Sequence, residues 1–326
     1  MEALPTVAII GDTMVDIQVA GLQALPAWGA DRDCRSVTML PGGSAANVAR
    51  QLGSIGIGRV RVALFSTVGS DESGRFFLRA LEEENVVATP RETLVVLDDT
   101  PQSTCVILSG PEDRAMVTCY TSIHKIELSI FEGHPSLERA AIVHIGSYFN
   151  LKGLHTTELI AFVRTCRARG ALITLDPQYD CDEAWSGVDG HLRRLLPLVD
   201  VFLPNEVEAC GVTGKATPEE ALETLAAEYP AMLTILSVGA DGALAARGSE
   251  RWRVGALEAR FVDATGAGDA FDAGCLLSLL RDRADVEGAI RSGVAAGAAA
   301  VSVLGACEHP IRREHHEAIL RDGCAK

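Results

Sequence analysis

Short apolar runs bounded by turn residues recur along the chain, and runs of this kind are typical of buried strands. The runs expected as strands cover residues 6–10, 60–68, 141–145, 171–175, 199–203 and 233–238. Apolar residues at helical spacing separate several of them, and the expected helices cover 71–84, 156–169, 217–229 and 271–280. Repeated strand–helix–strand units predict an α/β fold with a doubly wound, mostly parallel sheet flanked by helices. Such a sheet binds ligands at the carboxyl ends of its strands.

Two separate segments, about 14–38 and 94–122, depart from this rhythm because their apolar positions alternate with polar ones. Alternation with a period of two is typical of strands that have one wet face. A chain of 326 residues is long for one simple domain and short for two large ones. We therefore expect one α/β domain over residues 1–326 with a small β appendage.

Charge and cysteine content limit the class of protein. The net charge of −15 argues against nucleic acid or an anionic membrane as the main partner, since both require a basic surface. The nine cysteines include no C-x-x-C pair, which indicates reduced thiols in place of a disulfide framework. The longest uncharged stretch, 293–307, is shorter than the ~20 residues of a membrane helix, and no basic segment precedes an apolar run at the start. We expect a cytoplasmic protein.

The stretch 263–271, Asp-Ala-Thr-Gly-Ala-Gly-Asp-Ala-Phe, is the strongest candidate for chemistry. Gly266, Ala267 and Gly268 can present their N–H groups without bulky side chains, and at the start of a helix those donors form an anion site. Asp269 then lies in the first turn, beside the anion. An acid in that place makes sense if it accepts a proton during phosphoryl transfer. The alternative is an ordinary capped helix start.

A second candidate pair is Asn205 and Glu208, three residues apart at an expected helix start. Together they could orient the water ligands of Mg²⁺. The same spacing is also a helix capping pattern, and this pair alone would favour that interpretation. The loop from Ser237 through Gly239 to Gly242 could admit a nucleotide, or could be a simple hairpin turn.

Polar residues near the first strand suggest a polyol site. Asp12 and Asp16 bracket a strand end and could accept hydrogen bonds from vicinal hydroxyls. For Asp12, a turn or capping role is an equal alternative. Gly42 and Gly43 feed an expected helix on which Asn47 would point at a ligand, or they form a plain turn.

These motifs together resemble the ribokinase-like carbohydrate kinases, the phosphofructokinase-B type family, over nearly the whole chain. The matching pieces are Gly11-Asp12-x-x-x-Asp16, Gly42-Gly43-Ser44-Ala45-Ala46-Asn47-Val48-Ala49, Val68-Gly69-x-Asp71-x-x-Gly74, Asp176-Pro177, Pro204-Asn205-Glu206-x-Glu208-Ala209, Gly239-x-x-Gly242 and Asp263-x-Thr265-Gly266-Ala267-Gly268-Asp269-Ala270-Phe271. The resemblance implies an α/β core with a β lid, here about 14–38 and 94–122, that closes over a sugar and often builds a homodimer.

The resemblance also implies ATP and Mg²⁺ as cofactors, and a role for each candidate residue. Asp269 would be the base that deprotonates the acceptor hydroxyl, with Gly266, Ala267 and Gly268 as the anion hole. The residues implied for the cofactors are Asn205 and Glu208 for Mg²⁺, and Asn205, Ser237, Gly239 and Gly242 for ATP. Those implied for the sugar are Asp12, Asp16, Gly42, Gly43 and Asn47. Many members also bind K⁺, and Asp263 and Thr265 match part of that site.

Two departures bear on the acceptor. Ribokinases usually carry Asn where this chain has Met14, and Lys where it has Ser44, which argues against ribose. We therefore expect an ATP-dependent kinase that phosphorylates a primary hydroxyl of fructose, a similar ketose or a pentose. The alternatives are a nucleoside kinase of the adenosine or pseudouridine type and a catalytically silent relative that only binds. A dehydrogenase is excluded because Gly11-Asp12 does not continue into a G-x-G-x-x-G fingerprint.

Overall fold

A long sheet forms the centre of the molecule in this computed structural model, which describes residues 4–110, 114–262, 264–303 and 308–325. In spatial order its strands are β13 (Glu250–Val254), β12 (Ala243–Arg247), β11 (Leu233–Ser237), β10 (Val201–Phe202), β9 (Leu172–Leu175), β8 (Ile142–Ile145), β1 (Thr6–Ile10), β4 (Arg61–Gly69) and β5 (Leu94–Leu97). The pairs from β11 to β5 are parallel, and β12 and β13 add an antiparallel edge. The predicted doubly wound, mostly parallel sheet is confirmed.

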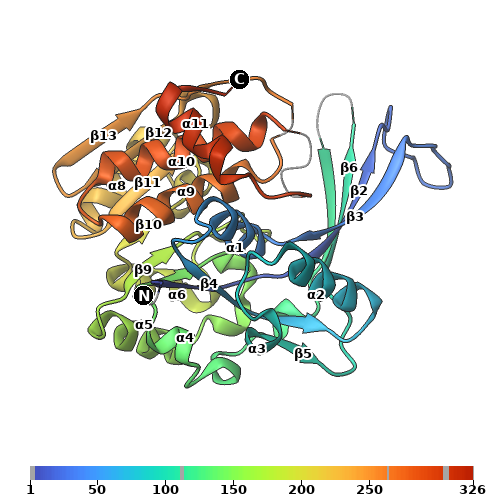
Figure 1. Ribbon diagram of the computed structural model, residues 1–326, viewed down its shortest axis with the longest axis horizontal. Coiled ribbons are helices and arrows are strands. Elements are labelled where there is room, and N and C mark those ends of the chain that lie inside the picture. The colour runs from blue at the N-terminus through green and yellow to red at the C-terminus, as the bar shows by residue number, and fades with distance from the viewer. Residues whose placement is uncertain (1–3, 111–113, 263, 304–307, 326) are drawn as a thin grey trace.

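Helices cover both faces of this sheet (Figure 1). The helices packed in the core of one face are α1 (Ser44–Ile55), α2 (Glu72–Glu84), α9 (Ala267–Arg281), α10 (Val286–Val301) and α11 (Arg313–Asp322). Those on the other face are α4 (Pro135–Glu138), α5 (Thr157–Ala168), α6 (His191–Leu195), α7 (Glu206–Thr213) and α8 (Pro218–Glu228). Because both faces are covered, the central strands are mostly apolar instead of alternating, although His144 in β8 and Thr174 in β9 are buried polar residues.

Side-chain caps explain where several helices begin. The Asp71 carboxylate accepts a hydrogen bond from the Gly74 N–H at 3.0 Å and starts α2. Thr156 and Thr217 cap α5 and α8 in the same way. Each cap satisfies one of the N–H groups that have no partner within the helix.

The Ala/Gly-rich α10 packs closely against α9, and this contact depends on glycine. A Cβ on Gly274 would lie 2.4 Å from the Ser292 carbonyl oxygen, and one on Gly293 would lie 2.5 Å from the Cys275 sulfur. Side chains at these two positions would therefore force the helices apart. In the described ranges, no helix is long and apolar enough to cross a membrane.

A second, smaller sheet stands apart from the body, on the right of Figure 1. Its strands, in order, are β3 (Ser36–Gly42), β2 (Met14–Ala20), β6 (Thr104–Ser109) and β7 (Arg114–Cys119). The segments predicted for this sheet, about 14–38 and 94–122, differ from the observed strands at two boundaries. The strand at the start of 94–122 is β5, which pairs with β4 in the large sheet, and β3 continues past residue 38. Alternation of apolar and polar residues identifies a strand but not the sheet that the strand joins. The predicted domain boundaries stay a prediction.

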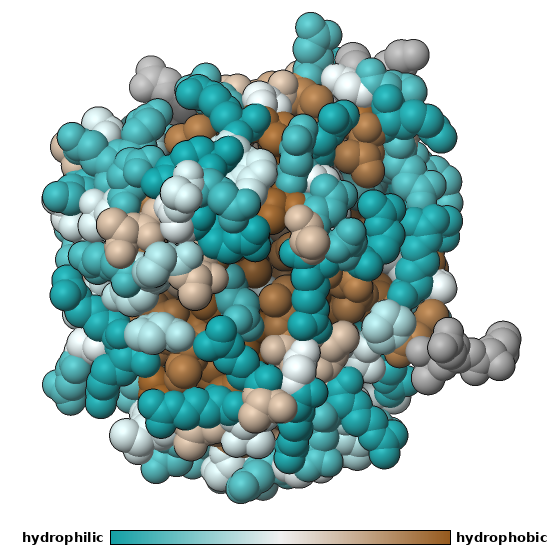
Figure 2. All heavy atoms as spheres, turned by 90° about the vertical axis from the view of Figure 1, so that its left-hand side faces the viewer, coloured by the Kyte–Doolittle hydropathy of each residue, from teal (hydrophilic) through white to brown (hydrophobic). Residues whose placement is uncertain are grey.

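Short elements complete the described chain. They are α3 (Pro90–Thr93), β14 (Glu258–Ala259) and β15 (Cys324–Ala325). The polar-to-apolar run 251–261 has the pattern of a single strand, but the structure divides it between β13 and β14. Cysteines 34, 105, 119, 166, 181, 210 and 275, within the described part of the chain, are free thiols. Figure 2 shows mostly hydrophilic residues on one face, with apolar residues visible in the hollows among them.

Candidate active site

The carboxyl edge of the large sheet borders a small cavity of about 70 Å³. Asp176 directly follows β9, and Asn205 follows β10 and bridges to Ser237 at the end of β11. The cavity is lined by Ser44, Asp176, Gln178, Leu203, Asn205, Glu208, Ser237, Gly268, Asp269 and Asp272. Five predicted pieces that are distant in sequence therefore meet at one place.

Asp269 is held by two side chains from the first turn of α1. The Ser44 hydroxyl donates to its Oδ1 at 2.7 Å, and the Asn47 amide donates to its Oδ2 at 2.9 Å. Ser44 also lies 3.2 Å from Asp176 Oδ2, but a single hydroxyl proton serves one acceptor at a time. Both oxygens of Asp269 are thus engaged, which fixes the orientation of the carboxylate. The helix starts of α1 and α9 face each other here.

Four carboxyl groups share this region, and none of the cavity-lining residues is cationic. Burial, followed by repulsion from nearby carboxylates, raises the pKa of Asp269 to about 7, although hydrogen bonds from Ser44 and Asn47 oppose this shift. Burial raises the pKa of Asp176 to about 6 and that of Glu208 to about 8. The pKa of the buried Asp272 also lies well above its usual range. Such a cluster favours a bound cation.

The glycine-rich turn has the backbone expected of an anion site. Gly266 adopts the left-handed region with φ 78°, and α9 begins at Ala267. A Cβ on Gly268 would meet no atom within 4 Å, so packing does not require glycine there. The Ala267 N–H donates to the Ala264 carbonyl at 3.3 Å, which occupies one of the three predicted donors within the chain.

Asn205 and Glu208 form the capping box that the sequence left as an alternative. The Asn205 backbone N–H and side-chain amide donate to the two Glu208 oxygens at 2.9 and 2.6 Å, and the Glu208 N–H donates to Asn205 Oδ1 at 2.9 Å. Each carboxylate oxygen can accept a further hydrogen bond, and Glu208 lines the cavity, so capping and water-mediated Mg²⁺ binding are compatible. No group of three or more His, Cys, Asp and Glu side chains in the described ranges is arranged to hold a metal directly.

Asp12 and Asp16 lie buried between the large sheet and the second sheet. Asp12 Oδ1 accepts from the Ser147 hydroxyl at 2.6 Å and from the Ala45 N–H at 2.9 Å. Burial, with Asp12 nearby, raises the pKa of Asp16 to about 7. A Cβ on Gly42 would lie 2.3 Å from the Asp16 carboxylate, and Gly43 has φ 94°. The diglycine therefore admits the acid beside it and turns the chain into α1.

The predicted nucleotide loop is only partly explained by packing. Gly242 has φ 92°, and a Cβ there would lie 2.2 Å from the Val254 carbonyl oxygen, so strand packing requires glycine. Gly239 has φ 53°, and a Cβ there would meet no atom within 4 Å. Gly239 therefore leaves open space beside the end of β11.

The sequence interpretation missed two residues. Asp272, three positions after Asp269, lies on the same face of α9, and an acid within an apolar helix was the available signal. Arg114, at the start of β7, donates from Nη1 to the Thr265 hydroxyl at 2.9 Å and so connects the second sheet to the glycine-rich turn. Thr265 was expected at a K⁺ site together with Asp263, which lies outside the described residues.

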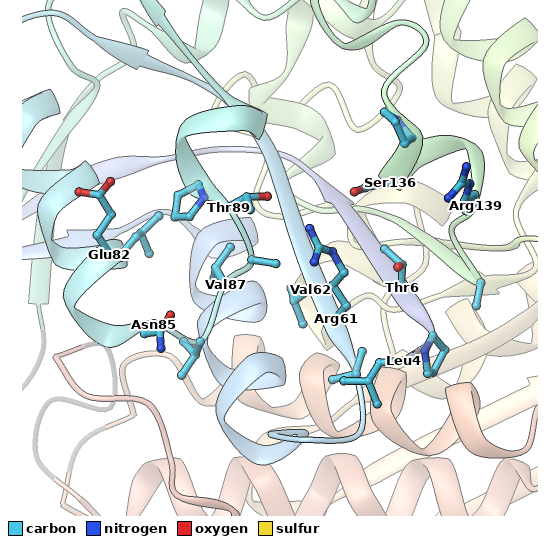
Figure 3. A pocket seen from close by; sticks show the side chains of 18 residues that line it. Leu4, Thr6, Arg61, Val62, Glu82, Asn85, Val87, Thr89, Ser136 and Arg139 are labelled. Atoms are coloured by element: carbon cyan, nitrogen blue, oxygen red, sulfur yellow. The ribbon is translucent and has the colours of Figure 1, made fainter. Parts of the chain in front are cut away.

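A much larger hollow of about 1090 Å³ lies at the opposite edge of the sheet, near the amino ends of β1 and β4. Arg61 and Arg139 are among its walls (Figure 3). None of the residues predicted for catalysis or binding lines it. Size alone therefore does not identify the chemical site.

Comparisons with known proteins identify the family of this chain. The sequence pattern of the pfkB family carbohydrate kinases matches residues 4–312. The chain is 29% identical over 278 residues to the ATP-dependent 6-phosphofructokinase of Thermoanaerobacterium thermosaccharolyticum, covering 84% of this chain and 81% of that protein.

Two solved structures share the fold over nearly the full length of both chains. Arabidopsis thaliana ribokinase, complexed with ribose and ATP, has a TM-score of 0.80 at 20% identity, with 98% of this chain and 99% of that chain covered. Vibrio cholerae fructokinase, bound to fructose, ADP and calcium, has a TM-score of 0.76 at 24% identity, with 97% and 99% covered. This chain belongs to the pfkB family of carbohydrate kinases.

Proposed function

We propose that this protein transfers the γ-phosphate of ATP to a primary hydroxyl of a small sugar, with fructose, a similar ketose or a pentose as the preferred acceptor. The observation that carries the proposal is Asp269, held by Ser44 and Asn47 at the start of α9 beside the open turn at Gly268. A base and an anion site thus lie side by side, as transfer to a hydroxyl requires.

Asp269 is the proposed general base. Its pKa, raised to about 7, lies near physiological pH, which favours proton transfer in both directions. The Ser44 and Asn47 hydrogen bonds orient the carboxylate before the acceptor arrives. Gly266 and Gly268, as proposed anion-hole residues, would bind the charge on the transferring phosphoryl group through backbone N–H groups.

Glu208 and Asn205 are proposed to hold Mg²⁺ through water. When bound, Mg²⁺ neutralises phosphate charge, and here it would also neutralise the carboxyl cluster that includes Asp176 and Asp272. The support for this role is that burial, followed by repulsion from Asp176, raises the pKa of Glu208 to about 8, so a nearby cation would favour its charged form. K⁺ at Thr265 and Asp263 stays a prediction from the family resemblance.

The sugar and the nucleotide are proposed to bind on opposite sides of Asp269. Asp12, Asp16, Gly42, Gly43 and Asn47 would hold the sugar, because the two buried acids can accept hydrogen bonds from vicinal hydroxyls. Ser237, Gly239 and Gly242, with Asn205, would border ATP.

A nucleoside acceptor is the alternative. The Tyr120 ring stacks on His124 with centroids 5.2 Å apart, and it packs on Met14, Cys105 and Ile107 in the second sheet. Aromatic and apolar groups of this kind could hold a base by stacking. Trp28, a second aromatic residue, lies between β2 and β3, and its side chain is fully exposed.

An ATP-consumption assay over fructose, ribose, fructose 6-phosphate, adenosine and pseudouridine, with and without K⁺, tests these proposals. We expect turnover with a free sugar, and we expect Asp269→Asn to reduce kcat by about 10²-fold or more, the range for loss of a general base. The matched control is Asp241→Asn, an exposed acid on the nucleotide loop. Turnover of Asp269→Asn within tenfold of the unchanged protein would overturn the base assignment. If none of the acceptors is phosphorylated, the protein is better explained as a catalytically silent relative that only binds its ligand.

We also propose a homodimer through the second sheet. Met39, Ile17, Val106 and Val117 are paired in register and form one apolar row across the sheet, on the face opposite to Asp16. Met39 is 40% exposed and Val117 is 64% exposed. Apolar rows of this kind mark interaction surfaces. Val117→Glu should shift the protein to monomers in analytical ultracentrifugation, and a monomeric unchanged protein would refute the dimer.

A cytoplasmic location stays a prediction from the cysteine pattern.

A further inference from the structure

A second charged hollow lies at the far end of the helix that carries Asp269. It has a volume of about 760 Å³ and is bordered by the last turn of α9, by α10 and by α11, which lie side by side in Figure 1. At 1.5 Å per residue, the 15 residues of α9 place its last turn roughly 20 Å from its first. This hollow is therefore separate from the carboxylate-lined cavity.

Four guanidinium groups line this hollow, and a single carboxylate opposes them. The arginines are Arg59, Arg281, Arg291 and Arg321, and the acid is Glu317. In a chain with a net charge of −15, this is a local concentration of the opposite sign. The partial negative charge at the carboxyl end of α9, about half an elementary charge, only partly offsets it.

The acid in the hollow does not neutralise the four cations. Glu317 Oε1 contacts Arg59 Nη1 at 2.9 Å and Arg313 Nε at 3.0 Å, so its charge is already shared. Arg321 lies 3.7 Å from Asp322. In the described ranges, neither Arg281 nor Arg291 makes an ion pair shorter than 4.0 Å. Arg281 on α9 and Arg291 on α10 are therefore available to an incoming anion.

A hydroxyl adds a polar group to the same wall. Ser278, one turn before the end of α9, is 9% exposed and lines the hollow. Leu277, Leu280 and Leu320 form the apolar remainder of the wall. A few converging polar groups on an apolar wall are typical of small-molecule sites.

We propose that this hollow binds a small anion with two or more negative charges, the chemistry of phosphorylated metabolites and polycarboxylates. Arg281 and Arg291 would each donate paired N–H groups to anionic oxygens, and the Ser278 hydroxyl would donate to a third. The bound anion would tie α9 to α10. The proposal does not depend on the acceptor of the catalytic site.

Titration calorimetry with inorganic pyrophosphate, without Mg²⁺, tests the site. Arg281→Gln/Arg291→Gln should weaken pyrophosphate binding at least about tenfold, because two charge-assisted contacts are lost. Arg61→Gln/Arg139→Gln is the matched control, since it removes the same charge from the other large hollow, where these arginines also make no ion pair among the described residues. It should change the dissociation constant less than twofold.

Three results would overturn the proposal. The first is that the unchanged protein does not bind pyrophosphate. The second is that Arg281→Gln/Arg291→Gln changes the dissociation constant less than twofold, which would assign binding to the catalytic anion hole. The third is that both double variants weaken binding equally. Arg281 and Arg291 are exposed, so thermal melting followed by circular dichroism should be unchanged in the double variant. If that variant melts early, Arg291→Gln compared with Arg139→Gln makes the same distinction.

Discussion

Asp269 shows how its surroundings prepare a single carboxyl group for proton transfer. Burial and the neighbouring acids favour its neutral form, whereas Ser44 and Asn47 favour its charged form. The balance places its pKa near 7, well above that of a free aspartate at about 3.9. A base with this pKa is mostly protonated in mildly acidic solution.

This environment predicts the pH dependence of the reaction. Because only the deprotonated carboxylate can accept the hydroxyl proton, kcat/KM for the sugar should fall about tenfold for each unit of pH below about 7. Above that value it should level off. The measurement is a pH–rate profile with saturating MgATP, and Ser44→Ala should move the midpoint upward because it removes a hydrogen bond to the charged form. A flat profile between pH 5 and 8 would contradict the assignment.

At the scale of elements, Arg114 of β7 is the described side chain that connects the second sheet directly to the turn preceding α9. If this sheet closes over the sugar, losing that contact should weaken the closed arrangement. Arg114→Gln should therefore raise KM for the sugar several-fold more than KM for ATP. Arg35→Gln, an exposed arginine beside β3, is the control. Equal changes in both KM values, measured by steady-state kinetics, would refute a role in closure.

Strands such as β1 and β9 could be predicted because each is a mainly apolar run bounded by turn or polar residues. β1 and α2 begin and end within one residue of their expected bounds. In contrast, α10 was not predicted, since Ala and Gly carry no amphipathic signal, and its glycines reflect contact with α9. Local patterns also could not show that β5 joins the large sheet.

The candidate site was predictable in its residue types but not in its pairings. Asp269 and Glu208 were identified from motifs, whereas the hydrogen bonds of Ser44 and Asn47 to Asp269 join segments more than 200 residues apart. The run Glu314-His315-His316-Glu317 predicts a solvated face of the last helix. His316 is instead buried, 3.1 Å from the Ser292 carbonyl oxygen, because α11 packs on α10.

Over the whole molecule, the acidic cluster makes folding depend on pH. Asp176, Asp269 and Glu208 have pKa values of about 6, 7 and 8 in the folded protein. In the unfolded chain, carboxyl groups titrate near 4. Between these limits the folded state binds more protons than the unfolded state, so stability falls as pH rises from about 4 and levels off above about 8. A cation that replaces the protons should restore it.

The last prediction follows from this balance. Without divalent ions, the melting temperature should be lower at pH 8 than at pH 6, and Mg²⁺ should raise it more at pH 8, where the carboxylates are charged. Glu208→Gln should reduce both effects, because it removes the group whose pKa is raised to about 8. Glu206→Gln, an exposed acid two residues away, should leave both unchanged. Differential scanning calorimetry makes the comparison. If Glu208→Gln keeps the full pH and Mg²⁺ dependence, Glu208 is not the residue through which the cation stabilises the fold.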